Sequence, residues 1–413
     1  MKRVFVTGMG VIVPNAMDIK EFSEALRAGK SGIGKLSCFD ASELPVQIGG
    51  EVKNFIPDKY CDPKTMRRQD RFSQLGLAAT EMAVKQAGLD NPSSFIPERV
   101  GVIFSSGIGG VITLIDEHKK YLEAGPNRVN PFLVPMMITN ITSGIIGMLY
   151  GFTGPNFSIT SACASSMHAI GEAYLKVVRG DADIMITGGS EAALLPLTYM
   201  GFAKIKALSK RNDEPEKASR PFDRDRDGFV MGEGGGALVI ESEESMIKRG
   251  STPLVEIVGY GSSADAYHLT APHPEGIGAA SAMQQALNFN SSNPQDISYI
   301  NAHGTATPLG DAVEIKAIHN VFGDHARNIS INSTKCMIGH LLGGAGVCGA
   351  IATILQMHEG FLHPNINLEN LDEELLEMRF TGQTAENKDI KLALVNSFGF
   401  GGQNASVILK SLN

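Results

Sequence analysis

The chain contains 413 residues, of which 43% are hydrophobic and 19% are charged, and its formal net charge is −8 at pH 7. This length suits two domains or one duplicated domain, and the small charged fraction excludes general disorder. The negative charge argues against nucleic-acid binding through bulk charge, although local basic patches for an acidic partner stay compatible with it. No apolar run reaches the roughly 18 residues that a membrane helix requires.

The chain begins with MKRVFVTGMGVIVP, whose two glycines and Pro14 indicate a strand and a turn rather than a signal peptide. We therefore expect a cytoplasmic protein. Further buried-strand candidates, rich in β-branched residues, are RVGVIFSSG, ADIMITGGS and GALVIE. Amphipathic segments lie between them, such as RFSQLGLAATEMAVKQAG (71–88), which is typical of a helix that ends at a glycine. This alternation predicts an α/β protein with mostly parallel sheets and helices packed on them.

Five cysteines occur, at positions 38, 61, 163, 336 and 348, and no two form a C-x-x-C pair. The odd number and the spacing argue against a disulfide framework and against a zinc site. Cys336 and Cys348 lie among glycine and alanine and are interpreted as core thiols.

Cys163 lies between a short predicted strand, FSIT, and a predicted helix, ASSMHAIGEAYLKVVRG, that ends at Gly180. A thiol at a strand-to-helix turn meets unpaired backbone N–H groups and the positive end of the helix dipole, which favour a thiolate. The position is compatible with a nucleophile, as the cysteine counterpart of a nucleophile elbow. Position alone leaves an equally good alternative, a small thiol packed in the core.

Four pairs of segments recur in the same order, which predicts two related halves, 1–250 and 251–413. The pairs are VTGMG (6–10) with IVGYG (257–261), VIFSSG (102–107) with YINAHG (299–304), NFSITS (156–161) with NISINS (328–333), and MITGGSE (185–191) with LVNSFGFGG (394–402). The first half is longer, and we expect its additional segments, 20–75, 110–145 and 204–227, to cap one end of the molecule.

Two of the ten histidines lie in segments unlike ordinary core, His303 in NAHGTATPLGD and His340 in STKCMIGHLLGGAG. Lys335 follows NISINS by two residues, as Cys163 follows NFSITS. If a two-fold axis relates the halves, the carboxyl ends of their strands meet, and these four residues converge. The alternative is that both histidines are structural residues with satisfied hydrogen bonds.

The glycine-rich segment NSFGFGGQNAS (396–406) lacks the G-x-x-x-x-G-K-[ST] spacing of a phosphate loop. A strand-like run, ASVIL, follows it instead of a helix. We therefore interpret it as a loop whose backbone N–H groups form an oxyanion hole.

Four segments, SACASS, NAHGTATPLGD, STKCMIGHLLGGAG and NSFGFGG, resemble the signature segments of the β-ketoacyl-acyl-carrier-protein synthases. SRPFDRDRDGFVMGEGGGALVIE (219–241) resembles a further family segment, so the resemblance extends over essentially the whole chain. It is greatest to synthase II, the elongating condensing enzyme of bacterial type II fatty-acid synthesis. The resemblance implies the thiolase fold, with two duplicated βαβαβαβ halves in an αβαβα five-layer sandwich. Gly344, Gln403 and Ser105 depart from the most usual family residues, but none of these changes removes a catalytic group.

The resemblance also implies a mechanism. Cys163 accepts the acyl chain of acyl-acyl-carrier protein, inside an oxyanion hole formed by its own N–H and that of Phe400. His303 and His340 serve the decarboxylation of malonyl-acyl-carrier protein, and the resulting carbanion attacks the acyl thioester. No metal and no redox cofactor is implied, because loss of CO₂ drives the condensation and the substrates travel on a phosphopantetheine arm.

Supporting roles follow from the same resemblance. Lys335 supports the site electrostatically, Glu314 is its expected partner, and Phe400 resembles a gating residue. Thr305 and Thr307 are expected to bind the phosphopantetheine arm, with Thr270 close by, and Ile108 to line the acyl pocket near the dimer interface. Because carrier proteins are acidic, we expect a basic docking surface formed by Lys64, Arg67, Arg68, Lys204 and Lys206. From the sequence alone, it is equally possible that these residues form a solvated surface that binds no partner.

We expect a homodimer that binds acyl carrier protein and neither nucleic acid nor membrane. The alternative is a ketosynthase subunit of a type II polyketide or polyene system, which forms a heterodimer with a chain-length partner. A chain-length factor without catalytic activity is a third possibility, but such subunits lack the nucleophilic cysteine, which this chain has at Cys163. Thiolase proper uses a second active cysteine in its C-terminal region, where this chain has none beyond Cys348.

Overall fold

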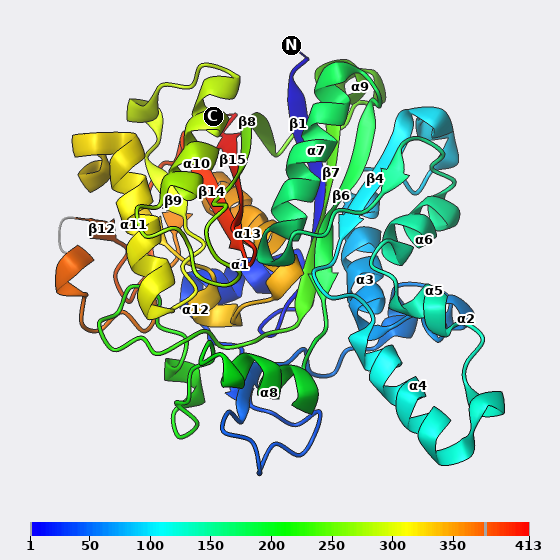
Figure 1. The fold of residues 1–413 in the computed structure, drawn as a ribbon. Helices are drawn as coiled ribbons and strands as arrows, with labels where there is room; N and C mark the ends of the chain where they lie inside the picture. The colour runs from blue at the N-terminus through cyan, green and yellow to red at the C-terminus, as the bar shows by residue number, and fades with distance from the viewer. Residues whose placement is uncertain (1, 376–377, 413) are drawn as a thin grey trace.

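The computed structural model describes residues 2–375 and 378–412, which form a layered α/β molecule around one large sheet (Figure 1). Eleven strands lie in the order β12-β10-β9-β14-β15-β8-β1-β7-β6-β4-β5. Their bounds are Val4–Ile12 (β1), Val100–Ser105 (β4), Asn156–Phe157 (β5), Ile184–Glu191 (β6), Gly234–Ser242 (β7), Val255–Ala264 (β8), Tyr299–Asn301 (β9), Ser330–Asn332 (β10), Arg379–Phe380 (β12), Leu392–Gly399 (β14) and Gln403–Lys410 (β15). Two small antiparallel sheets pair Ile33–Lys35 (β2) with Ile48–Gly50 (β3), and Phe361–Leu362 (β11) with Glu386–Asn387 (β13).

The sheet repeats its own order about its centre, where β1 pairs with β8. Reading outward, β1-β7-β6-β4-β5 on one side corresponds to β8-β15-β14-β9-β10 on the other. The four recurring sequence pairs fall on β1 and β8, β4 and β9, β5 and β10, and β6 and β14. Each weak match in the sequence therefore joins two strands that hold equivalent places in the fold.

Four of the five strands in each repeat run in one direction, and one runs against them. β4 is parallel to β5 and β6, whereas β7 is antiparallel to both β6 and β1. The second repeat has the same pattern, with β15 antiparallel to β14 and β8. The mostly parallel orientation expected from the sequence is thus found within each repeat, with β7 and β15 as the exceptions; β14 and β15 are joined by a short turn, which only antiparallel strands accept.

Helices form three layers around and between the two halves of the sheet (Figure 1). Helices α7 (Ser165–Arg179) and α13 (Ala345–Glu359) pack on each other and on strands of both halves. Helix α13 is buried on all sides from Ala345 to Met357, as expected of a helix enclosed by protein. The outer layers contain α3 (Arg71–Gln86) and α6 (Ile141–Tyr150) on one side, and α10 (Ile277–Phe289) and α11 (Pro308–Phe322) on the other. The result is the αβαβα sandwich implied by the resemblance.

The additional segments of the first half lie mainly at one end of the molecule. Figure 1 shows α2, α4 and α5, which belong to these segments, at the lower right of the view, away from the two termini. The remaining helices are α1 (Ile19–Ala28), α2 (Pro63–Met66), α4 (Val111–Ala124), α5 (Leu133–Met137), α8 (Pro196–Lys204), α9 (Glu243–Arg249) and α12 (Lys335–Ile338). Within residues 2–375 and 378–412, no helix is long and apolar enough to cross a membrane.

Candidate active site

Cys163 lies on a tight turn at the start of α7. The predicted strand before it is shorter than expected, because β5 ends at Phe157 and residues 158–161 have left the sheet. Residues Ala162–Ala164 form one turn of 3₁₀ helix, and Ala162 has a φ of 48°, a left-handed conformation that is costly for a residue with a Cβ. The strained turn places the cysteine directly before the first turn of the helix.

The second half repeats this turn, and the repeat corrects one step of the sequence argument. Leu342 has a φ of 46°, Leu342–Gly344 form a 3₁₀ turn, and α13 follows. The structural counterpart of Cys163 is therefore Gly343, and not Lys335. Lys335 belongs to α12, a short helix that the first half lacks, so equal spacing after the matched strands did not indicate equal positions.

One cavity brings together most of the residues singled out in the sequence. Cys163, His303, His340 and Phe400 line it, as do the three threonines at 270, 305 and 307. They come from the 3₁₀ turn before α7, from the loops after β9 and α12, from the β8–α10 connection and from the β14–β15 turn. Lys335 is buried behind the cavity wall with 7% of its surface exposed. Residues more than 200 positions apart thus meet at one set of strand ends.

The two histidines face each other at the base of the cavity. Their ring centroids are 5.4 Å apart at an interplanar angle of 84°. Phe398 lies 5.7 Å from the His303 ring, and Phe229 lies 5.2 Å from the His340 ring. Burial, followed by the positive charge of Lys335, holds the pKa of both imidazoles well below the usual range. Both rings are therefore neutral near pH 7, and each has one N–H to donate.

The Cys163 thiol and the Lys335 ammonium act on each other electrostatically. Burial raises the pKa of the thiol to about 11, although Lys335 and the backbone N–H of Phe400 act to lower it. Burial also lowers the pKa of the Lys335 ammonium to about 8, against the influence of the Glu314 carboxylate. The helix N-terminus was expected to favour a thiolate, but desolvation of the thiol outweighs this influence in the folded protein.

Glu314 supports the site differently from the expected ion pair. Its carboxylate accepts the backbone N–H of His303 and that of Gly304, both at 2.8 Å, and the side-chain amide of Asn396 at 3.1 Å. Among the described residues, no ion pair within 4.0 Å joins it to Lys335, and the two interact only as nearby charges. The N–H groups at the end of β9 are buried and need an acceptor, which explains why the carboxylate lies there.

The end of β14, just before its turn into β15, touches the cysteine turn directly. The Ser397 hydroxyl donates to the carbonyl of Cys163 at 2.9 Å. A Cβ built on Gly399 would lie 3.3 Å from the Cys163 nitrogen, so the two backbones are in contact there. The N–H groups of Phe400 and of Cys163 itself both act on the thiol. Two backbone donors therefore lie at the sulfur, close to where an oxyanion would form on a carbonyl that the sulfur attacks.

Of the remaining predicted residues, Thr305 and Thr307 lie at the cavity, whereas Ile108 and the basic residues do not line it. The hydroxyls of Thr305 and Thr307 lie 3.0 Å apart on the cavity wall. Ile108 does not line this cavity; it lies on the loop after β4 with 38% of its surface exposed. Lys64, Arg67 and Arg68 form an exposed cluster at α2, and Lys204 and Lys206 are exposed beside Ile205, which lines the cavity.

Sequence reasoning missed several residues that shape the site. The most notable is Glu191, a fully buried carboxylate at the end of β6, which accepts the Ser106 hydroxyl and the N–H groups of Gly107, Ile108 and Gly343. The sequence feature that could have identified Glu191 is its position at the end of a predicted strand, in the segment MITGGSE. Phe202, Phe229 and Phe398 gave none, because isolated aromatic residues are typical of any core.

The family model for the beta-ketoacyl synthase N-terminal domain matches residues 1–245, and that for the C-terminal domain matches residues 254–369. The chain belongs to the beta-ketoacyl synthase family. Proteins named 3-oxoacyl-[acyl-carrier-protein] synthase 2 are 45% identical in Synechocystis, 43% in Coxiella burnetii and 45% in Staphylococcus aureus, each over 99% of this chain and 98% of the relative. This protein is accordingly a condensing enzyme of the acyltransferase class.

Solved structures agree with this assignment. A beta-ketoacyl synthase from Burkholderia phymatum superposes with a TM-score of 0.93 at 33% identity, and the ishigamide ketosynthase/chain length factor with 0.91 at 32%. A type II polyketide ketosynthase in complex with its acyl-carrier protein gives a TM-score of 0.90 at 29% identity. All three matches cover the whole of both chains. The thiolase-like fold predicted from the sequence is thereby confirmed.

Proposed function

We propose that this protein condenses acyl-acyl-carrier protein with malonyl-acyl-carrier protein in type II fatty-acid elongation, giving β-ketoacyl-acyl-carrier protein, CO₂ and free carrier protein. The observation that carries the proposal is the single cavity in which Cys163, two neutral histidines and two backbone donors meet. The relatives named 3-oxoacyl-[acyl-carrier-protein] synthase 2 support this pathway at 43–45% identity, against 32% for the ishigamide ketosynthase/chain length factor and 29% for the type II polyketide ketosynthase.

Acyl transfer comes first. The Cys163 sulfur loses its proton, attacks the thioester carbonyl, and the oxyanion forms against the N–H groups of Cys163 and Phe400. Because burial holds the pKa of the thiol near 11, proton removal is coupled to attack, and a neutral histidine is the nearby acceptor. The carrier thiol leaves with a proton, and the acyl group remains on sulfur.

Decarboxylation and condensation follow. Both imidazoles are neutral, so each donates one N–H toward the thioester oxygen of the malonyl group without adding a full charge. The C–C bond to the carboxylate breaks, CO₂ departs, and the electron pair forms an enolate that these donors stabilise. The enolate carbon attacks the acyl carbonyl, and Cys163 leaves as a thiolate beside the Lys335 charge. No metal or redox cofactor takes part, because loss of CO₂ supplies the driving force.

Acyl carrier protein is the proposed partner that delivers both substrates. Its acidic surface suits the exposed cluster of Lys64, Arg67 and Arg68, and Lys204 and Lys206 lie beside the cavity. The phosphopantetheine arm then reaches Cys163 past Thr270 and the hydroxyls of Thr305 and Thr307.

A second copy of the chain is the proposed structural partner. Strand β5 lies at the edge of the sheet, and within residues 2–375 and 378–412 it pairs only with β4, which leaves one side of its backbone open. Large apolar side chains are exposed on β5 and on α6, which packs against it, and this favours burial against another subunit; they are Phe157, Met148 and Leu149.

The test is the purified protein with acyl carriers of C6 to C16 chain length and malonyl-acyl-carrier protein, with β-ketoacyl product and sedimentation mass as readouts. We expect product from the protein alone and the mass of a dimer. Replacement Cys163→Ala should abolish acyl transfer, and acyl-enzyme formation by that variant would refute the assigned nucleophile. Absence of product at every length, with activity restored by a partner subunit, would support the polyketide alternative instead.

A further inference from the structure

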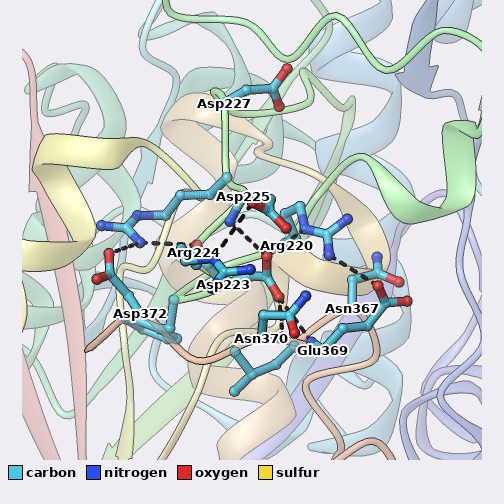
Figure 2. A network of polar contacts seen from close by, with 12 residues as sticks. Arg220, Asp223, Arg224, Asp225, Asp227, Asn367, Glu369, Asn370 and Asp372 are labelled. Atoms are coloured by element: carbon cyan, nitrogen blue, oxygen red, sulfur yellow. Dashed lines mark hydrogen bonds and ion pairs between the residues drawn. The ribbon is translucent and has the colours of Figure 1, made fainter. Parts of the chain in front are cut away.

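Residues 219–228, which lie outside the cavity, are fixed by buried charges (Figure 2). The Asp223 carboxylate is fully buried and accepts the Arg220 side chain at 3.0 Å. It also accepts the backbone N–H groups of Glu369 at 2.9 Å and of Asn370 at 2.8 Å. Burying a carboxylate is costly unless it has such partners, so this network fixes the segment rigidly to residues 367–372.

Arg226 extends from this fixed segment to the loop between β9 and α11. Its Nε donates to the Thr307 carbonyl at 3.2 Å, and one terminal nitrogen donates to the Pro308 carbonyl at 2.8 Å. The other terminal nitrogen donates to the Asp223 carbonyl at 2.9 Å and to the Asp372 carboxylate at 2.6 Å. Only 4% of the side chain is exposed, and Arg226 does not line the cavity. The planar fork of a guanidinium makes all these bonds at once, which an ammonium cannot do.

The loop held by Arg226 would not adopt its shape unaided. Ala306 has a φ of 68°, which is strained for a residue with a Cβ. Its N–H is accepted by Asp311 at 3.1 Å, and its carbonyl accepts the N–H of Gly228 at 3.1 Å. The residues on either side of it, Thr305 and Thr307, present the paired hydroxyls to the cavity. The direction of both hydroxyls therefore depends on bonds made from outside the cavity.

We propose that Arg226 is a positioning residue that sets the Thr305 and Thr307 hydroxyls for the phosphopantetheine arm. This rests on the proposed function, since the arm is the ligand of those hydroxyls. Replacing Arg226 should weaken recognition of the arm and leave the chemistry at Cys163 intact. A residue with a merely structural role would reduce both together.

The experiment compares acylation of Cys163 by two donors of the same six-carbon chain. Hexanoyl-pantetheine carries the arm without a carrier protein, and p-nitrophenyl hexanoate carries no arm. For Arg226→Lys we expect KM for hexanoyl-pantetheine to rise about tenfold, as for loss of one or two hydrogen bonds, with kcat nearly unchanged. Acylation by p-nitrophenyl hexanoate should stay within about twofold of wild type. Rates are expressed per site that is acylated in a single-turnover burst, so unfolded molecules are not counted in the comparison.

Arg220→Lys is the matched control. Arg220 belongs to the same network and is equally buried, with 4% of its side chain exposed, but it bonds Asp223 and Glu369 and not the 305–308 loop. It should lower thermal stability as Arg226→Lys does, without changing KM for hexanoyl-pantetheine. Equal loss with both donors in Arg226→Lys, an unchanged KM, or the same KM shift in Arg220→Lys would overturn the proposal. Failure of the wild type to accept any carrier thioester would instead overturn the proposed function.

Discussion

Replacement Gly399→Ala tests the oxyanion hole, because it places one methyl group between the β14–β15 turn and the cysteine turn. The new Cβ would lie 2.6 Å from the Ser161 carbonyl oxygen and 3.3 Å from the nitrogens of Cys163 and Ala164. Real Cβ atoms essentially never approach a neighbour within 3.0 Å. All three neighbouring atoms are backbone atoms, so none can rotate away, and the two segments must separate by about 0.4 Å or more.

The separation moves the Phe400 N–H away from the Cys163 sulfur. Oxyanion donors act at about 2.7–3.1 Å, and loss of one donor typically slows the reaction by about 10²–10³-fold. A partial displacement should therefore slow acylation of Cys163 by about 10- to 100-fold. The measurement is single-turnover transfer from an acyl-carrier thioester, followed by mass spectrometry of the acyl-enzyme.

Gly401→Ala is the companion variant in the same turn. Gly401 has a φ of 86°, so an alanine strains the backbone, but its Cβ would meet only the Gln403 side chain at 4.0 Å. We expect a stability loss of about 1 kcal/mol and a much smaller effect on acylation. Wild-type acylation by Gly399→Ala, or an equal loss in Gly401→Ala, would refute the steric reasoning.

Two further predictions concern charge and packing. Lys335→Ala removes the cation that lowers the pKa of Cys163, so alkylation of the thiol by iodoacetamide at pH 8 should slow by about tenfold per unit of pKa gained. In the wild type Lys335 itself loses its proton near pH 8, so alkylation should rise more shallowly above that pH than it does in Lys335→Ala; parallel profiles would contradict the coupling. Gly171→Ala pushes a methyl group into the Tyr260 ring where α7 meets β8, and should lower the free energy of unfolding in urea by about 1–3 kcal/mol. Gly144→Ala in α6, whose Cβ meets open space, should not; equal losses would show that packing against Tyr260 is not responsible.

Much of the fold could be predicted from local sequence patterns. Recurring segments such as VTGMG and IVGYG indicated equivalent strands, because both halves need the same small residues where a strand meets its covering helix. The helix predicted at 71–88 is found at Arg71–Gln86, with Gly88 in the left-handed conformation. The direction of β7 was not available, because strand direction depends on how a long connection returns to the sheet.

The sequence by itself determined which residues could carry out the chemistry: a lone cysteine at a strand-to-helix turn, histidines after strands and a glycine-rich turn. These features depend on short-range spacing along the chain, so they can be recognised without knowledge of the packing. Only the tertiary structure decided how the groups act. Burial makes both histidines neutral and raises the pKa of Cys163 to about 11, and neither effect can be seen in a linear sequence. The tertiary structure likewise directed Glu314 to the backbone of His303 and brought Arg226 to the threonine loop, because buried donors and acceptors must find partners wherever folding places them.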